Sequence, residues 1–143
     1  MSCYKKEYGE CVPAITTEAY IFTNFKPGEL PDLKFYTPIV AWDTGAYQSS
    51  ISMEVVKALH LKPKGQTPVM VLGGERLVDV YEISIGLPNG KIYHDVEVYG
   101  AELDEYAALI GMDIITQTDF LITNKDSKTI FQFRTPSKGD VEL

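Results

Sequence analysis

The stretch Ile39-Val40-Ala41-Trp42-Asp43-Thr44-Gly45-Ala46 decides the fold of this chain. Its first half is an apolar run typical of a buried strand, and that run delivers a carboxylate, Asp43, straight into a Thr-Gly turn. An acid at the end of a strand, backed by apolar residues and opened by a glycine, is partly desolvated yet reachable, which suits a catalytic acid. Asp also begins many ordinary turns, and at residue frequencies of roughly one in twenty Asp-Thr-Gly arises by chance in on the order of a few per cent of chains this long. The triplet alone is therefore suggestive and no more.

Most apolar segments around this stretch are short, rich in β-branched and aromatic residues, and bounded by Gly, Pro, Asn or Asp, which predicts a mainly β protein. A hairpin is expected at Pro88-Asn89-Gly90, because Asn and Gly both tolerate positive φ between two alternating runs. A final hairpin is expected around the polar loop at Asn124–Ser127. The expected strands are Glu18–Thr23, Phe35–Trp42, Pro68–Leu72, Tyr81–Leu87, Ile92–Tyr99, Phe120–Thr123 and Thr129–Arg134.

Two segments depart from the β pattern. Ser52 is expected to cap a helix from Met53 to about His60, with Glu54 in the first turn. The segment Asp113–Gln117 is expected to form a helical turn at most. The 143 residues contain no internal repeat, low-complexity tract or Gly/Ser-rich linker. We therefore expect a single domain over residues 1–143, with its core over about residues 18–137.

Charge, hydropathy and cysteine content exclude several classes of function. A net charge of −7 and a pI near 4.8 argue against nucleic acid as a partner. No apolar run approaches the ~20 residues that span a bilayer, and no secretory signal is recognisable, so we expect no membrane association and a cytoplasmic location. Cys3, Cys11, His60 and His94 lie outside any metal-binding spacing, so no metal and no cofactor is expected. In a reducing compartment free thiols are favoured over a Cys3–Cys11 disulfide.

The segment Asp43-Thr44-Gly45-Ala46, following an apolar strand, resembles the active-site loop of the retropepsin-like aspartic peptidases. In that family a hydrophobic-hydrophobic-Gly element packs behind the catalytic loop and leads into a short helix. Leu109-Ile110-Gly111-Met112-Asp113-Ile114-Ile115 resembles this element, and Val71-Leu72-Gly73-Gly74-Glu75 stands where the family places its glycine-bearing flap. Taken singly, each is equally consistent with an ordinary strand end or hairpin turn. Their order around Asp-Thr-Gly makes the resemblance specific from about residue 18 to 115.

The end of the chain resembles a bacterial-type branch of the group, whose terminal hairpin closes on a sequence like Phe131-Gln132-Phe133-Arg134-Thr135-Pro136-Ser137. Retroviral members end soon after the helix, and many carry an arginine at the position of Met112. That departure removes a structural ion pair and leaves the geometry of the dimer interface open. The resemblance implies a closed, acid-protease-like β barrel, formed as a single retropepsin-type lobe with one or two short helices.

The function that the resemblance implies is that of an aspartic endopeptidase acting on peptides or proteins in extended conformation. Its chemistry needs two carboxylates facing one water, one acting as general base while the other, protonated, polarises the peptide carbonyl. The chain has one Asp-Thr/Ser-Gly, so the second Asp43 must come from another copy across a twofold axis, which makes a homodimer the expected partner state. Two carboxylates about 3 Å apart repel by roughly 5 kcal/mol at an effective dielectric near 20, so they share a proton.

The same resemblance gives roles to the neighbouring residues. Thr44 is expected to hydrogen-bond across the dimer axis, Gly45 to let the substrate backbone approach closely, and Ala46 to line the site. Leu72, Gly73, Gly74 and Glu75 are expected to form a flap that closes over the substrate. Ile110 and Gly111 are expected to pack behind the catalytic loop.

Two other functions stay open at this point. One is a module that keeps the fold and binds peptides or dimerises, with weak or absent catalysis. The other is an unrelated small β enzyme or ligand carrier, in which Asp43 is an ordinary turn residue. Cleavage specificity, physiological substrate and pH optimum do not follow from the sequence.

Overall fold

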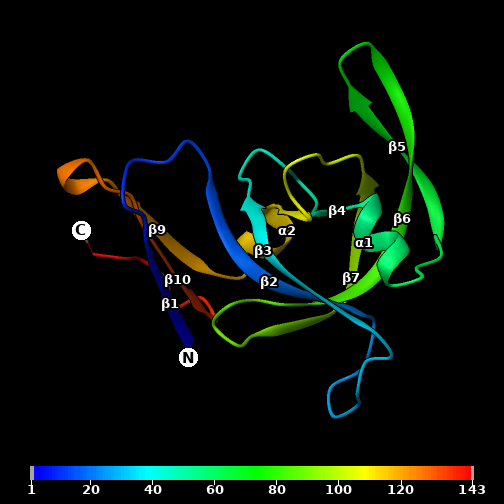
Figure 1. Ribbon diagram of the computed structural model, residues 1–143, viewed down its shortest axis with the longest axis horizontal. Coiled ribbons are helices and arrows are strands. Elements are labelled where there is room, and N and C mark those ends of the chain that lie inside the picture. The colour runs from blue at the N-terminus through cyan, green and yellow to red at the C-terminus, as the bar shows by residue number, and fades with distance from the viewer. Residues whose placement is uncertain (1, 143) are drawn as a thin grey trace.

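The computed structural model describes residues 2–142 and confirms the mainly β architecture. The strands form a three-stranded sheet in the order β1-β10-β9 and a seven-stranded sheet in the order β2-β3-β8-β4-β7-β6-β5. In the larger sheet β2 also pairs with β6, so the sheet curls into a ring (Figure 1). The strands are β1 (Ser2–Glu7), β2 (Ile15–Thr23), β3 (Lys34–Trp42), β4 (Ser50–Ser52), β5 (Gly65–Val71), β6 (Gly74–Gly86), β7 (Ile92–Ala101), β8 (Ala108–Ile110), β9 (Asp119–Thr123) and β10 (Ile130–Thr135).

The helices are short, as expected. Helix α1 (Met53–Ala58) begins at the predicted cap, where the Ser52 hydroxyl accepts a hydrogen bond from the Val55 amide, but it ends before His60, whose φ is 52°. Helix α2 (Met112–Ile115) is a single turn that begins and ends earlier than the predicted segment. A 3₁₀ turn, η1 (Lys125–Ser127), lies in the loop between β9 and β10. Among residues 2–142, no helix has the length and apolar character that crossing a membrane requires.

Three strands were not predicted from the sequence. β4 and β8 are three residues long, which is too short for a periodic pattern to stand out. β1 is rich in charge and precedes the expected start of the core at residue 18, yet it pairs with β10 along its whole length. Its Tyr4 ring lies 5.6 Å from the Phe133 ring. The packed structure therefore begins well before residue 18.

The hairpin between β6 and β7 forms where it was predicted, but its turn differs from the expected one. Only Gly90 has a positive φ, of 90°. The Gly90 amide donates to the Leu87 carbonyl at 3.0 Å, and the Leu87 amide donates to the Lys91 carbonyl at 2.8 Å. Pro88 thus occupies the second position of a turn that suits its fixed φ, and Gly90 supplies the left-handed residue that a three-residue hairpin loop requires.

An aromatic cluster joins the two sheets directly below Asp43. The Trp42 ring lies 4.9 Å from the Phe133 ring and 5.1 Å from the Phe131 ring, both on β10. The Trp42 indole N–H donates to the Thr17 hydroxyl at 3.0 Å, so its polar atom is satisfied inside the core. The residue before Asp43 is therefore fixed by packing and by a hydrogen bond. The surrounding core includes Ile21, Val40, Ile51, Val55, Ile83, Val98, Ile110 and Ile114.

Candidate active site

The strand order places Asp43 over the end of β8. β3 and β4 follow one another along the chain, yet β8 lies between them, parallel to β3 and antiparallel to β4. The connecting loop, residues 43–49, must therefore pass around the end of β8. The Asp43 amide donates to the Ile110 carbonyl at 2.8 Å, which ties the start of this loop to the strand behind it. The fold thus brings together two segments that the sequence analysis singled out separately.

Within the loop, the Asp43 side chain is half-buried and held by its own turn. Its Oδ1 accepts a hydrogen bond from the Gly45 amide at 2.9 Å, and the Ala46 amide donates to the Asp43 carbonyl at 3.2 Å. A Cβ added to Gly45 would lie 3.2 Å from that Oδ1, so a glycine leaves room for the carboxylate. Thr44 and Gly45 are exposed, and Ala46 is half-buried. The turn aims one carboxylate and its two following residues at the surface.

Gly111 has no room for a side chain. A Cβ there would lie 2.8 Å from the Ala46 carbonyl oxygen and 2.9 Å from the Gln48 carbonyl carbon. The next two residues then bond the loop: the Met112 amide donates to the Ala46 carbonyl at 2.8 Å, and the Asp113 amide donates to the Tyr47 carbonyl at 3.2 Å. The first amides of α2 therefore support the loop backbone from behind.

A polar clamp that the sequence analysis missed holds the far end of the loop. Asp113 Oδ1 accepts a hydrogen bond from the Ser49 hydroxyl at 2.8 Å, and the Asp113 carboxylate also accepts one from the Ser49 amide at 3.1 Å. The Ser49 hydroxyl in turn accepts from the Gly111 amide at 2.9 Å. Ser49 and Asp113 are 64 residues apart, and no local pattern connects them. This clamp stands beside Met112.

The predicted flap is a hairpin of β5 and β6 that projects from the body of the molecule (Figure 1). Its tip is the turn Leu72-Gly73, so Leu72 lies outside the strand that was expected to contain it. Gly73 and Gly74 have φ values of 96° and 128°, and no atom lies within 4 Å of the Cβ position of either. The Leu72 side chain is fully exposed. Conformation, and not crowding, therefore explains the two glycines at this tip.

A groove of about 850 Å³ lies between this hairpin and the body, and most of its lining is apolar. Ala46 belongs to its wall, whereas Asp43, Thr44 and the tip residues 72–75 do not. Asp43 and Thr44 instead border a smaller hollow of about 350 Å³ on the side of the terminal sheet. The groove wall includes Tyr47, Gln48, Met53, Val69, Met70, Leu77 and Tyr99.

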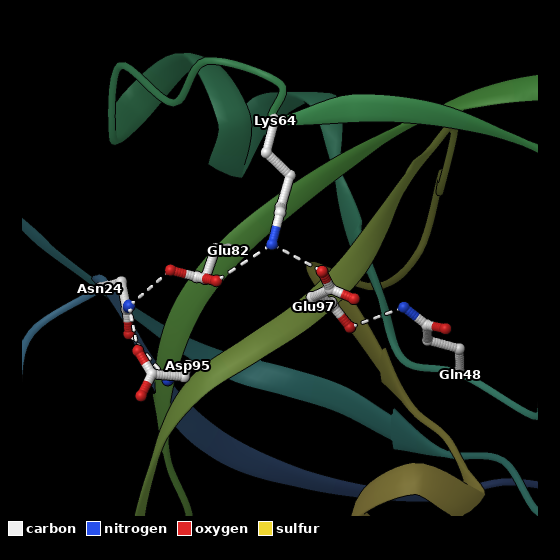
Figure 2. Close-up of polar contacts among 6 residues, drawn as sticks. All are labelled: Asn24, Gln48, Lys64, Glu82, Asp95 and Glu97. Atoms are coloured by element: carbon white, nitrogen blue, oxygen red, sulfur yellow. Dashed lines mark hydrogen bonds and ion pairs between the residues drawn. The ribbon is translucent and has the colours of Figure 1, made fainter.

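Polar contacts connect the loop after Asp43 and the segment before β5 to strands β6 and β7, as Figure 2 shows. The Gln48 side-chain amide donates to the Glu97 carbonyl at 2.8 Å, which ties the loop after Asp43 to β7. Lys64 lies 2.6 Å from a Glu97 carboxylate oxygen and 3.3 Å from one of Glu82. These hydrogen bonds, to Glu97 first and then to Glu82, raise the pKa of the Lys64 ammonium. All three side chains are substantially exposed, so the pairs orient the strands more than they stabilise the fold.

Among residues 2–142, no group of three or more His, Cys, Asp and Glu side chains is arranged to hold an ion. Cys3 and Cys11 are both exposed and unbridged.

No family model and no curated protein matches this chain. Two solved structures align with most of this chain. The crystal structure of a retropepsin-like aspartic protease from Rickettsia conorii aligns with 92% of this chain and 94% of its own, at 15% identity and a TM-score of 0.51. The simian foamy virus (mac) protease aligns with 71% of this chain and 92% of its own, at 20% identity and a TM-score of 0.49. This chain therefore has a retropepsin-like fold, as the resemblance in its sequence implied.

Proposed function

We propose that this protein is an aspartic endopeptidase that acts as a homodimer, with Asp43 as its catalytic residue. The observation that carries the proposal is the way the carboxylate is presented. Asp43 leaves a buried strand, its backbone is bonded to Ile110, and its side chain reaches the surface in a turn that α2 supports from behind. Peptide hydrolysis needs a positioned acid of this kind. The retropepsin-like fold adds support, because the Rickettsia structure of that fold is an aspartic protease.

One copy supplies one such carboxylate, so the reaction requires two copies. The ionised Asp43 takes a proton from water as the water oxygen attacks the carbonyl carbon, and the protonated Asp43 of the partner donates to the carbonyl oxygen. The carbon–nitrogen bond of the tetrahedral intermediate then breaks as the Asp43 that took the proton from water gives it to the leaving nitrogen. The Asp43 of the partner takes a proton back from a hydroxyl of the intermediate, so the products are an amine and a carboxylic acid and both carboxyls return to their starting states. Repulsion between two close carboxylates keeps one of them protonated, which is the state that this chemistry uses.

The surrounding residues take the roles that their positions allow. Thr44 and Gly45 are exposed beside Asp43 and would face the second copy, while Ala46 would contact the substrate from the groove wall. The hairpin tip at Leu72, Gly73, Gly74 and Glu75 would close over an extended peptide in the groove. Ile110 and Gly111 would keep the loop in place. Residues 1–143 would act together as one lobe.

The test uses the full chain and an unfolded, fluorescence-quenched protein substrate, assayed from acid to neutral pH. Wild type is expected to cleave it, and Asp43→Asn is expected to lose at least ~10³-fold in rate, because general acid–base catalysis is removed from both halves of the site. Asp104→Asn is the matched control, since Asp104 is an exposed acid outside both hollows. Equal rates for wild type and Asp43→Asn would refute the proposal.

A peptide-binding or dimerisation module with weak catalysis is the second candidate. It is favoured by one observation, namely that the large groove is lined by Ala46 but not by Asp43. Such a module would bind the unfolded substrate with equal affinity in wild type and Asp43→Asn and would cleave it in neither. Measuring binding by fluorescence anisotropy alongside cleavage separates the two functions.

A further inference from the structure

The base of the flap hairpin is the point where β6 leaves the body of the molecule (Figure 1). On β6, Tyr81 is 2% exposed, whereas Leu77, which lies closer to the tip, is 62% exposed. The β5–β6 pair closest to the body joins Gly65 to Val80, and the Lys64 amide donates to the Val80 carbonyl at 2.8 Å. The hairpin therefore leaves the body at the level of Lys64.

Two glutamates stand directly opposite one another next to this base. Glu82 on β6 pairs with Glu97 on β7. Like charges that face one another across antiparallel strands destabilise the pairing. Lys64 points between them, 3.3 Å from a Glu82 oxygen and 2.6 Å from a Glu97 oxygen, as Figure 2 shows. One cation from the base of the hairpin therefore joins two carboxylates that would otherwise repel one another.

The Lys64 side chain reaches beyond the strand next to it. The sheet order is β7-β6-β5, and within residues 2–142 the edge strand β5 pairs with β6 alone. To contact Glu97, Lys64 crosses β6 and reaches β7. The bridge therefore ties the start of β5 to a strand with which β5 shares no backbone pairing.

From β7 the contacts continue to the loop that carries Asp43. The Glu97 carbonyl accepts a hydrogen bond from the Gln48 side chain at 2.8 Å. Gln48 follows Asp43 in the same loop, and it lines the large groove together with hairpin residues such as Met70. Lys64, Glu97 and Gln48 therefore form a continuous series of polar contacts that connects the two walls of the groove.

We infer that Lys64 is a positioning residue for substrate binding, whose ion pairs hold the flap hairpin in the position at which an extended peptide fits the groove. This inference rests on the proposed function, in which a peptide occupies that groove. The Asp43 turn is held by a separate set of bonds, from Ile110 and from α2. Loss of the Lys64 bridge should therefore weaken peptide binding and leave the chemical step unchanged.

The test compares two lysines of the same segment. Lys64→Gln removes the charge of the bridge but keeps a polar side chain, and Lys64→Arg keeps the charge. Lys62→Gln is the matched control, because it changes the net charge equally and Lys62 is exposed and forms no ion pair within residues 2–142. Each full-length variant is assayed with the unfolded, fluorescence-quenched protein substrate, and circular dichroism gives its Tm.

Lys64→Gln is expected to raise KM roughly fivefold with kcat unchanged, since two exposed ion pairs contribute a free energy of that order. Lys64→Arg should recover most of the affinity, and Lys62→Gln should match wild type. Because salt screens exposed charges, the ratio of KM between Lys64→Gln and Lys62→Gln should fall towards one as salt is added. A lower Tm of Lys64→Gln with an unchanged KM would overturn the inference, since the bridge would then only stabilise the fold.

Hydrogen exchange gives a second measurement that needs no substrate. Amides of residues 64–80 are expected to exchange faster in Lys64→Gln than in Lys62→Gln, while those of residues 53–58 in α1 exchange alike in both variants. Equal exchange of the hairpin in the two variants would overturn the inference whatever the substrate assay shows, because the bridge would then not hold the hairpin.

The same variants separate this inference from the proposed function. If wild type binds the unfolded substrate without cleaving it, the peptidase proposal fails, and the dissociation constant from fluorescence anisotropy takes the place of KM. The inference then stands if Lys64→Gln raises that constant and Lys62→Gln does not. If wild type cleaves through Asp43 while Lys64→Gln keeps the wild-type KM, the inference fails and the peptidase stands. A chain that neither binds nor cleaves the substrate would refute both.

Discussion

The Asp43 turn and the flap tip both depend on glycine, but for opposite physical reasons. At Gly111 the backbone of the Asp43 loop leaves no space, and a Cβ would lie 2.8 Å from a carbonyl oxygen. At Gly73 and Gly74 space is open on all sides, and the positive φ values are what favour glycine. One region is therefore held by close packing and hydrogen bonds, while the other has open space around it. The proposed peptidase function would use both properties, a fixed acid and a cover with room to move.

Of the substitutions that test this difference between the two glycine sites, Gly111→Ala is expected to have the largest effect. The added methyl group meets backbone atoms that cannot rotate away, so we expect a loss of about 3 kcal/mol in the free energy of unfolding. Urea denaturation of the full chain measures it. Gly73→Ala is the control within the comparison, and a loss at Gly111 no larger than at Gly73 would contradict the idea of a locked loop.

Ser49→Ala removes one partner of the clamp and is expected to have the next largest effect. The Gly111 amide and the Asp113 carboxylate would each lose a bond inside a buried site, which costs about 2 kcal/mol. Ser50→Ala is a matched control for stability, because Ser50 is the neighbouring buried serine and does not take part in the clamp. If both variants unfold at the same urea concentration, the clamp does not stabilise the fold.

Gly73→Ala is expected to cost only about 1 kcal/mol, since the penalty is conformational and no atom is displaced. Gly73→Asn should recover part of it, because Asn tolerates a left-handed conformation better than Ala. If the peptidase proposal holds, both variants should raise KM more than they lower kcat. A loss of stability as large for Asn as for Ala would show that crowding, and not φ, limits this position.

The smallest effect is expected at a second carboxylate clamp, which lies at the surface. Hydrogen bonds from Ser137, from the Lys138 amide and from Arg134 hold the pKa of Asp119 well below its usual range. Because the folded pKa is depressed, this stabilisation is present above about pH 4 and disappears as the pH falls towards the folded value. Asp119→Asn should therefore lower Tm slightly at neutral pH, and the difference from wild type should shrink in acid. Parallel melting curves down to pH 2 would contradict this.

The sequence analysis worked where the signal was local. Asp43 could be found because an apolar strand, a carboxylate and a glycine are neighbours in the chain, and the two hairpins could be found from their turn residues. The order of the Gly111 element and the flap around Asp43 then gave the fold through resemblance. Each motif taken by itself spans fewer than about a dozen residues, which is the range over which backbone preferences act.

What was missed depends on contacts between distant segments. β4 and β8 each pair with a strand on both sides, so they form without an alternating apolar pattern in their own sequences. The Ser49–Asp113 bond links positions 64 residues apart, and no residue pattern near either position in the sequence predicts it. Leu72 continues an apolar run, which predicts a strand. The strand instead ends at Val71, because the two glycines after Leu72 adopt positive φ values and the turn begins at Leu72.

The insertion of β8 between β3 and β4 has a consequence for the order in which this protein forms. A ribosome makes β3, the Asp43 turn and β4 long before it makes residues 108–113, so the nascent chain has the carboxylate without the strand that supports it. Closing that distant contact is an entropic step that comes late and slows folding. The acid is therefore synthesised early but positioned late, and a chain that ends before residue 108 would hold Asp43 without the strand that supports it.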